Sequence, residues 1–452
     1  MPRRGGAGED QRVVPLNRGF GVARGMQAQD LLDPLIGGPG TKGYPHLAAP
    51  LRRSAIAAQR WNLLRGDLPL PLAVIQRDAL AGNLRWMQQF ARGHGVELAP
   101  HGKTTMSPQL FAAQLQAGAW GITFASLTQA HLGLASGVRR GLIANQLAAA
   151  VDLEALALLL EQFEGARVLF LVDSLAQLEL IEAWQRGRGT APAPLEVLLE
   201  IGLADGRTGC RSAAQALALA RALHASAATR LAGIECFEGL WASGRSAEDE
   251  ALVSGLLQRV AELAQACERE QLFDNGEVLV SAGGSAIFDL VAPRLKPVLS
   301  KPVRGVLRSG CYVTHDHGSY QRYLAAMDTR LGCGHGLHAA LQVWAMVQAM
   351  PEQGLAILTA GKRDLSYDIE MPIPIQWCRR GQMQAAAAPA DWKISAMNDH
   401  HAYLRCGAGT ELQVGDRVGL GISHPCTTFD KWRWMAVVDD RFDVVDAITT
   451  HF

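Results

Sequence analysis

Short apolar segments alternate with amphipathic stretches through the first three quarters of the chain. After Asp78, a good N-cap, Leu80, Leu84, Met87 and Ala91 recur at helical spacing. Eight apolar segments have the length of strands, and each is followed by enough chain for a helix; they cover residues 97–100, 121–124, 141–144, 168–172, 195–201, 231–236, 278–281 and 303–307. Eight such repeats predict an α/β fold, a (β/α)8 TIM barrel.

The pattern changes after residue 330. Apolar stretches with turn residues between them follow at 341–349, 355–359, 393–396, 401–404 and 417–420. They predict a smaller, mostly antiparallel β domain. Ahead of the barrel, residues 27–68 are rich in turn residues, with one helix expected at 55–64. We therefore divide the chain into an N-terminal extension (1–69), a barrel domain (70–330) that opens with a short strand at 70–75, and a C-terminal β domain (331–452) that begins with a hinge-like loop at 331–336.

Composition narrows the class of protein. The 452 residues carry 43 basic and 43 acidic side chains, so a nucleic acid or an acidic membrane is not an expected partner. Eight cysteines are scattered without a Cys-x-x-Cys pair, which argues against a disulfide framework or a zinc ribbon. The sequence has no signal-peptide core and no apolar run approaching the ~18 residues of a membrane span. These features predict a cytoplasmic enzyme.

A lysine marks the first predicted strand-to-helix junction. Lys103 follows the strand at 97–100, Ser107 and Pro108 are good N-cap and first residues of the next helix, and Gly118 is a good helix stop. Parallel barrels carry their reactive groups at this end of the strands. A desolvated lysine there can form a Schiff base with a carbonyl compound. Most lysines near strand ends are solvated and have no catalytic role. Whether Lys103 is reactive therefore depends on the remaining motifs.

Gly283, Gly284 and Ser285 follow the seventh predicted strand. Such a loop lets backbone N–H groups approach a phosphate, with the positive end of the next helix behind them. Barrel phosphate sites favour the loops after strands seven and eight. An ordinary glycine-rich turn is the alternative for this motif taken alone.

His424 and Cys426 flank a proline late in the β domain. In an extended segment both side chains would share one face, where imidazole and thiolate suit zinc. A buried histidine and cysteine in a core strand is the simpler alternative. A rival metal cluster is His315, Asp316 and His317, next to glycine and serine residues that suggest a flexible loop.

These motifs together resemble the D-threonine aldolase and D-serine dehydratase family. The resemblance rests on Pro-His-Gly-Lys-Thr at 100–104, Leu-Gln-Ala-Gly-Ala-Trp-Gly-Ile-Thr at 115–123 and His-Pro-Cys-Thr-Thr-Phe-Asp-Lys-Trp at 424–432. The last segment is closest to the D-serine dehydratase-like amino acid deaminase branch. The family consists of pyridoxal 5'-phosphate (PLP) enzymes with an alanine racemase-like fold, and its members are expected to be homodimers.

The resemblance implies a role for each candidate residue. Lys103 carries PLP, the loop of Gly283, Gly284 and Ser285 holds its phosphate, and Arg207 lies by its ring. Tyr312 contacts the cofactor or packs with its hydroxyl satisfied. A divalent metal, with zinc favoured, binds His424 and Cys426, and His401 borders the substrate.

The implied activity is a PLP- and metal-dependent lyase that converts D-serine or D-threonine to a 2-oxo acid and ammonia. Aldol cleavage on the same scaffold is the nearest competing reaction. Aldolase relatives tend to have Glu-Gly-His where this chain has Glu238, Gly239 and Leu240, and leucine cannot take a proton. Racemisation also stays open, as does a PLP-binding protein without turnover.

Overall fold

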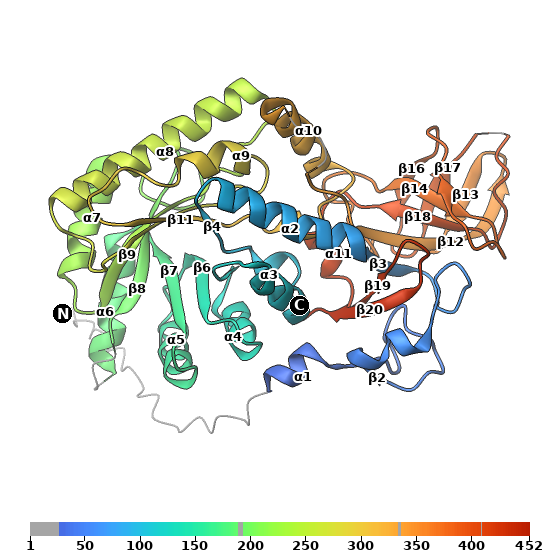
Figure 1. Ribbon diagram of the computed structural model, residues 1–452, viewed down its shortest axis with the longest axis horizontal. Coiled ribbons are helices and arrows are strands. Elements are labelled where there is room, and N and C mark those ends of the chain that lie inside the picture. Colours follow the sequence, from blue (N-terminus) through green and yellow to red (C-terminus); the bar gives the residue numbers. More distant parts are fainter. Residues whose placement is uncertain (1–26, 189–192, 333–335, 408) are drawn as a thin grey trace, which may run out of the picture.

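The computed structural model describes residues 27–188, 193–332, 336–407 and 409–452. Eight parallel strands form a nearly closed barrel, in the spatial order β4, β11, β10, β9, β8, β7, β6, β5 (Figure 1). One isolated parallel bridge, between His101 and Thr123, links the two ends of this order. The strands are β4 (Glu97–Leu98), β5 (Ile122–Phe124), β6 (Arg140–Gln146), β7 (Arg167–Val172), β8 (Leu195–Ile201), β9 (Thr229–Cys236), β10 (Val278–Ala282) and β11 (Val303–Leu307). The predicted barrel is confirmed.

Helices surround these strands and bury the barrel's outer face. They are α2 (Arg77–Gly93), α3 (Pro108–Ala117), α4 (Leu127–Ala135), α5 (Ala150–Gln162), α6 (Leu175–Gly187), α7 (Ala213–Ala225), α8 (Ser246–Arg269), α9 (Phe288–Val291) and α10 (Ser319–Leu331). The largest apolar cluster lies between strands and helices, and a smaller cluster that includes Leu142, Leu169, Leu198 and Leu279 fills the barrel interior. The interior is therefore a packed core, and only the strand ends are open to a ligand.

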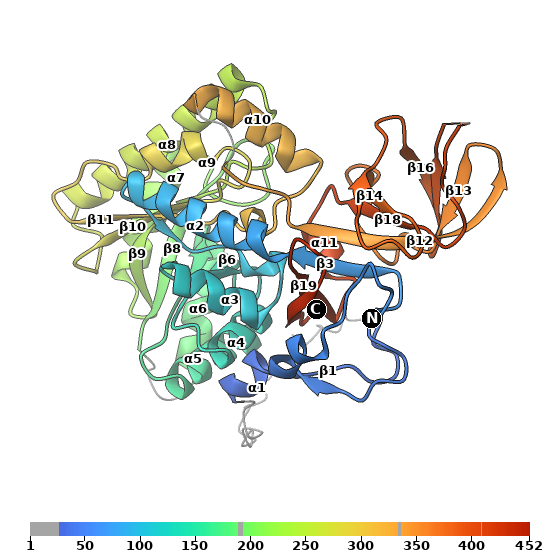
Figure 2. The ribbon, with the colours of Figure 1, turned by 45° about the vertical axis from the view of Figure 1, so that its right-hand side comes forward.

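A second, mostly antiparallel sheet lies beside the barrel (Figure 2). It contains β12 (Leu341–Glu352), β13 (Leu355–Leu358), β14 (Ile373–Cys378), β15 (Ala386–Ala387), β16 (Lys393–Met397), β17 (Ala402–Arg405), β18 (Arg417–Gly421), β19 (Trp434–Val438) and β20 (Val444–Thr449). The five predicted strands of this region are present. The strands β14, β15, β19 and β20 were not predicted from the sequence.

The strand at the start of the predicted barrel domain belongs to this second sheet. β3 (Leu72–Gln76) pairs antiparallel with β12 and parallel with β19. All residues of β3 except the last are buried, which is typical of a central strand. A continuous apolar run of this kind does not indicate which sheet the strand joins. From β3 the chain thus passes from the β domain into the barrel at α2 and returns to the β domain after α10.

Most of the described N-terminal extension packs on the β domain, whereas its first helix contacts α3 of the barrel. It contains α1 (Ala28–Leu32), the short strands β1 (Leu35–Ile36) and β2 (Leu51–Arg52), and two 3-10 turns at Arg53–Ala55 and Ala57–Gln59. The helix expected at 55–64 is wrong, because Arg60 has a φ of 55° and ends the second turn. Residues 1–26 and 333–335, the middle of the expected hinge loop, lie outside the described residues.

Candidate active site

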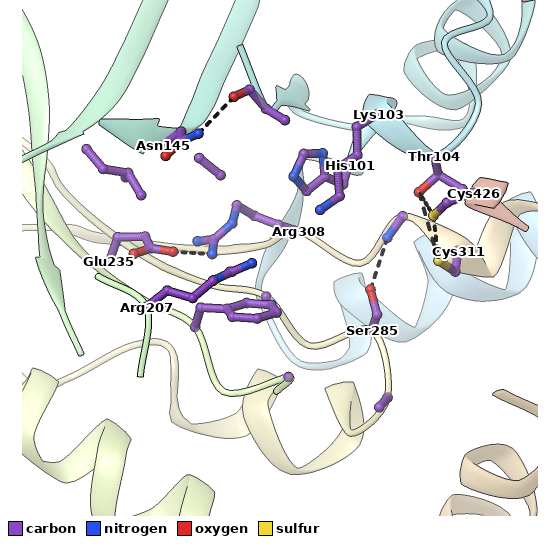
Figure 3. Close-up of a pocket in the computed structure, with 18 of the residues that line it drawn as sticks. His101, Lys103, Thr104, Asn145, Arg207, Glu235, Ser285, Arg308, Cys311 and Cys426 are labelled. Carbon is purple, nitrogen blue, oxygen red and sulfur yellow. Dashed lines mark hydrogen bonds and ion pairs between the residues drawn. The ribbon is translucent and has the colours of Figure 1, made fainter. Parts of the chain in front are cut away.

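A cavity of 370 Å³ opens at the carboxyl ends of the barrel strands, within the size range of small-molecule sites. Its walls come from the barrel loops and from the segment between β18 and α11 (Cys426–Phe429) of the β domain (Figure 3). The side chains that line it include His101, Lys103, Thr104, Asn145, Glu200, Arg207, Glu235, Ser285, Arg308, Cys311, Tyr320, His424 and Cys426. The candidate lysine and the candidate metal ligands therefore face one space.

Lys103 lies in a 3-10 turn, Gly102–Thr104, between β4 and α3. The predicted local signals are present: the Ser107 hydroxyl accepts the Leu110 N–H, Pro108 begins the helix, and Gly118 ends it at a φ of 113°. The Lys103 side chain is exposed to the cavity. The sequence led us to expect a desolvated amine on a reactive lysine, but the Lys103 amine is open to solvent. A bound ligand would have to bury it.

The glycine loop after β10 also forms a wall of the cavity. A Cβ on Gly283 would lie 2.4 Å from the Phe237 ring, so only glycine fits there. Gly283 and Ser285 line the cavity together with Gly310 from the loop after β11, and the Gly310 N–H donates to the Ser285 hydroxyl over 3.5 Å. Two adjacent backbone loops thus face the space where a phosphate is expected.

The helix expected behind the glycine loop differs from the prediction. α9 has four residues and begins only at Phe288. The Gly284 N–H donates to the buried carboxylate of Glu238, so this amide is used within the protein. The cradle therefore consists of loop backbone and the Ser285 hydroxyl, without a long helix behind it.

Arg207 and Arg308 bring positive charge to the cavity. Arg207 lies over the Phe237 ring, with its guanidinium carbon 4.8 Å from the ring centroid. Arg308 is buried directly after β11, donates to Ser281 over 2.7 Å and forms an ion pair with Glu235. Burial raises the pKa of Glu235 to about 8, although Arg308 acts in the opposite direction.

Two more titratable groups at strand ends face this space. The pKa of His101 lies well below its usual range because the ring is buried and near the charges of Lys103 and Arg308. Burial raises the pKa of Glu200, which accepts a 2.8 Å hydrogen bond from Thr208. The sequence analysis assigned no role to His101, Glu200, Glu235 or Arg308. The signal for the last three was available, since each is a charge at the end of an apolar strand.

His424 and Cys426 line the cavity next to the Lys103 turn, since Cys426 Sγ lies 3.5 Å from the Thr104 hydroxyl (Figure 3). The His424 Nδ1 atom is 2.6 Å from Asp368 Oδ2, and Asp368 also accepts a 2.7 Å hydrogen bond from Thr427. A carboxylate on one ring nitrogen is the usual arrangement around a metal-binding histidine, since it orients the ring and leaves the other nitrogen for the metal.

The electrostatics of this pair suit a thiolate ligand. Contact with the Cys311 thiol, followed by contact with His424, lowers the pKa of Cys426 well below its usual range. Burial opposes protonation of His424, but contacts with Cys426 and Asp368 raise its pKa to about 9. The predicted extended segment is wrong, because Cys426 is the first residue of α11. Both side chains nevertheless reach the cavity.

Three of the predicted site residues lie outside the cavity wall: Gly284, Tyr312 and His401. Tyr312 packs in the barrel core, where its hydroxyl accepts a 3.5 Å hydrogen bond from the Gln114 side-chain amide. This agrees with the packing alternative of the two given for Tyr312. A different tyrosine, Tyr320, lines the cavity. His401 lies between β16 and β17 and does not line the cavity.

The rival cluster does not form a metal site. His315, Asp316 and His317 are largely buried, so the flexible loop suggested by their neighbours is wrong. Within the described residues there is no group of three or more histidine, cysteine, aspartate or glutamate side chains placed to hold a metal. His424 and Cys426 would thus supply two ligands and leave the remaining positions to water or substrate.

Comparison with known proteins identifies the family. Residues 75–295 match the N-terminal domain of alanine racemase, and residues 340–438 match a putative serine dehydratase domain. The D-threo-3-hydroxyaspartate dehydratase of Delftia sp. (strain HT23) is 30% identical over 381 residues, which cover 80% of this chain and 92% of that protein. The chain belongs to the D-threonine aldolase and D-serine dehydratase family.

Further members of this alanine racemase-like, PLP-dependent family are similar to the chain over most of its length. The D-threonine aldolase of Arthrobacter sp. is 27% identical over 82% of this chain and 89% of its own length. The solved structure of the Delftia dehydratase covers 86% of this chain and 99% of that one, with a TM-score of 0.68 and 26% identity. Another structure of the dehydratase is of a cysteine-to-alanine variant in the metal-free form.

The residues of this chain fit both groups that the family suggests. For PLP, the cavity offers an exposed amine on Lys103 and a backbone cradle at Gly283 in which a Cβ would have no room. For a divalent metal, it offers a lowered-pKa thiol on Cys426 and the imidazole of His424 held by Asp368. Imidazole and thiolate are ligands that zinc prefers.

Proposed function

We propose that this protein is a PLP- and metal-dependent lyase. It would convert D-amino acids with a β-hydroxyl group, such as D-serine or D-threonine, to 2-oxo acids and ammonia. One observation carries the proposal: Lys103 of the barrel and the pair of His424 and Cys426 of the β domain line the same cavity. An amine and a metal pair in one space can act on adjacent atoms of one substrate.

In this proposal Lys103 has two tasks. It binds the cofactor, and its Nζ atom takes the α-proton of the substrate after the substrate amine has replaced it. PLP, when bound, supplies the electron sink for the charge left on the α-carbon. Gly283 and Ser285 would hold the phosphate, whereas the Gly284 N–H is already bound to Glu238. Arg207 would lie by the ring, where a cation discourages protonation of the pyridine nitrogen.

His424 and Cys426 are proposed to hold the metal, with zinc favoured by the donor set. A divalent ion there would act as a Lewis acid on the β-hydroxyl group and help it leave. Asp368 keeps the His424 ring in place through the 2.6 Å contact with Nδ1. The carbon skeleton then loses water, and hydrolysis of the resulting enamine releases ammonia.

The wall next to the metal pair favours a small, uncharged β-substituent. It consists of Thr104, Cys311 and Tyr320; contact with Cys426 and burial raise the pKa of Cys311, and the neighbouring Cys311 and burial raise the pKa of Tyr320, each well above its usual range. These three side chains carry no positive charge for a second carboxylate, and of the cations that line the rest of the cavity, Lys103 and Arg207 are assigned to the cofactor and Arg308 is paired with Glu235. We therefore propose D-serine or D-threonine as the substrate, rather than the hydroxyaspartate named for the Delftia relative.

Aldol cleavage, the reaction of the aldolase relatives, is less well supported by the loop after β9. Gly239 lines the cavity, but the Leu240 side chain is 54% exposed and is not part of the cavity wall. A leucine there cannot take a proton from the substrate hydroxyl, which aldol cleavage needs. Elimination needs no base at this position.

We further propose that the enzyme is a cytoplasmic homodimer. Its described cysteines are all free, as is typical of a reducing compartment. Among the described helices, none is long and apolar enough to cross a bilayer. His401 lies outside the cavity of its own subunit, and it would contact the substrate only if the β domain of one subunit faced the barrel of another.

A product assay tests the reaction. Purified protein with PLP and Zn²⁺ is incubated with a panel of D- and L-amino acids, and ammonia, 2-oxo acid and glycine are measured together. We expect ammonia and 2-oxo acid in equal amounts from D-serine or D-threonine. Glycine and an aldehyde would indicate aldol cleavage, and cofactor binding without any product would indicate a PLP-binding protein without turnover.

A further inference from the structure

Two cysteines from different domains meet in the cavity. Cys311 begins the 3-10 turn Cys311–Val313 after β11, and Cys426 begins α11 of the β domain. Their sulfur atoms are 3.9 Å apart, and the Thr104 hydroxyl lies 3.5 Å from Cys426 Sγ and 3.9 Å from Cys311 Sγ (Figure 3). The reaction proposed above uses Cys426 as a metal ligand and leaves Cys311 without a task.

We propose that Cys311 and Cys426 form an oxidative modification site, at which a hydroperoxide joins the two thiols in a disulfide and thereby abolishes metal binding. The inference rests on the proposed function only in taking Cys426 as a metal ligand. The main support for the inference is the proximity of the two sulfur atoms. An S–S bond is about 2.05 Å long, so the sulfurs need to approach by only about 2 Å.

The chemistry balances with a hydroperoxide as the oxidant. The sulfur of Cys426 attacks one peroxide oxygen, so an S–O bond forms, the O–O bond breaks, and water or an alcohol leaves. Cys311 Sγ then attacks that sulfur, the S–S bond forms, and the S–O oxygen leaves as water with the thiol proton. Two thiols lose two electrons and two protons, and the peroxide takes them up.

The location of the pair gives the modification its selectivity. Both cysteines line the cavity, so a molecule as small as hydrogen peroxide reaches them through the substrate entrance. The remaining described cysteines, at positions 210, 236, 267, 378 and 406, are buried and do not line this cavity. A bound metal would occupy the Cys426 sulfur and compete with oxidation, whereas the disulfide would remove one of two protein ligands.

The test is oxidation of full-length protein with hydrogen peroxide, with and without Zn²⁺. After free thiols are alkylated, non-reducing peptide mass spectrometry should find the peptides of Cys311 and Cys426 joined, with the loss of two hydrogens. A chromogenic chelator should detect Zn²⁺ release in proportion to this cross-link, and dithiothreitol should restore Zn²⁺ binding. Preloaded Zn²⁺ should slow the cross-link.

Two variants make the test specific. Cys311→Ser removes the second thiol, so peroxide can only add oxygen to Cys426, and dithiothreitol should restore less Zn²⁺ binding than in the wild type. Cys406→Ser, in a buried position of the β domain, should form the cross-link like the wild type. Failure to find the joined peptides in oxidised, metal-free protein overturns the inference. A cross-link without any Zn²⁺ release would confirm the disulfide but contradict the loss of the metal, and with it the proposed role of Cys426 as a metal ligand.

Discussion

The two walls of the cavity are built in different ways. The Lys103 wall is local, because β4, the turn and α3 follow one another within 21 residues of chain, and Ser107 and Gly118 fix the helix ends. The His424 wall depends on long-range contacts, because its histidine is held by Asp368, 56 residues away, and its cysteine contacts Cys311, 115 residues away. One wall would bind the cofactor, and the other would bind the metal.

This difference leads us to expect that the two halves of the proposed chemistry can be separated. If the barrel wall holds PLP alone, changes in the β domain should leave the cofactor in place and remove the metal. If both walls depend on each other, every change should affect both ligands. Single substitutions, with cofactor and metal measured separately, distinguish these cases.

The largest effect is expected for Lys103→Ala. Without the amine the protein should lose both the yellow absorbance of bound cofactor and the proton acceptor at the α-carbon, so kcat should fall by about 10³-fold or more. Absorbance spectra and ammonia release measure the two effects. Lys296→Ala, at an exposed position away from the cavity, is the matched control. Retention of both absorbance and activity would show that another group binds the cofactor.

A smaller effect is expected for His424→Ala. The variant should keep the cofactor absorbance but lose the bound metal, and activity should fall by about 10²-fold because the hydroxyl leaves without a Lewis acid. Metal content by mass spectrometry and cofactor absorbance are measured on the same sample. His400→Ala, an exposed histidine of the β domain, serves as the control. Loss of the cofactor together with the metal would contradict the separation of the two walls.

The local wall was also the more predictable from sequence. The barrel strands and the caps of α3 follow from apolar periodicity and from single capping residues, which act over a few positions. β3 shows where this fails, since a buried strand carries no information about its partner and this one joins β12 and β19. The same reason explains β14, which pairs with β18, and β19, which pairs with β3, whereas β20 was missed although its partner β19 directly precedes it.

The candidate site was predictable to a similar extent. The predicted residues Lys103, Arg207, Gly283, Ser285, His424 and Cys426 all reach the cavity, whereas Gly284, Tyr312 and His401 do not. Asp368 and Cys311 lie outside any recognisable motif, and only folding brings them to the metal pair. Long-range partners of candidate ligands are thus the part of a site that spacing along a chain cannot predict.

Asp368→Asn tests one such partner. The amide can still contact the His424 ring but no longer holds it through a charge, so metal affinity should fall by about 10- to 100-fold. Titration with Zn²⁺ in competition with a chelator measures it, and excess Zn²⁺ should restore activity. Glu370→Gln is the control. Glu370 lies in the same segment as Asp368, but its carboxylate pairs with Arg322 of α10 and does not bind the His424 ring. Equal Zn²⁺ affinity in wild type and Asp368→Asn would remove Asp368 from the metal site.

The smallest effect concerns Glu235 of the barrel wall and appears in stability. Its pKa of about 8 in the folded protein lies above the ordinary unfolded value of about 4.3, so the folded state keeps a proton that the unfolded state has released. This contribution to stability is fully present below the unfolded pKa and is lost as the pH rises towards 8. Glu235→Gln cannot titrate.

The free energy of unfolding of wild type relative to Glu235→Gln should therefore fall by a few kcal/mol between about pH 5 and about pH 8.5 and then stay constant. Denaturant unfolding at several pH values measures it. Glu196→Gln, which loses the partly exposed pair with Arg167, controls for the removal of a charge and should not show this fall. If Arg308 instead keeps Glu235 ionised in the folded protein, both the folded and the unfolded states are ionised above about pH 5, so the difference between wild type and Glu235→Gln stays constant over this range. The presence or absence of the fall therefore tells whether Arg308 carries its charge unpaired, available to a bound anion, or already neutralised by Glu235.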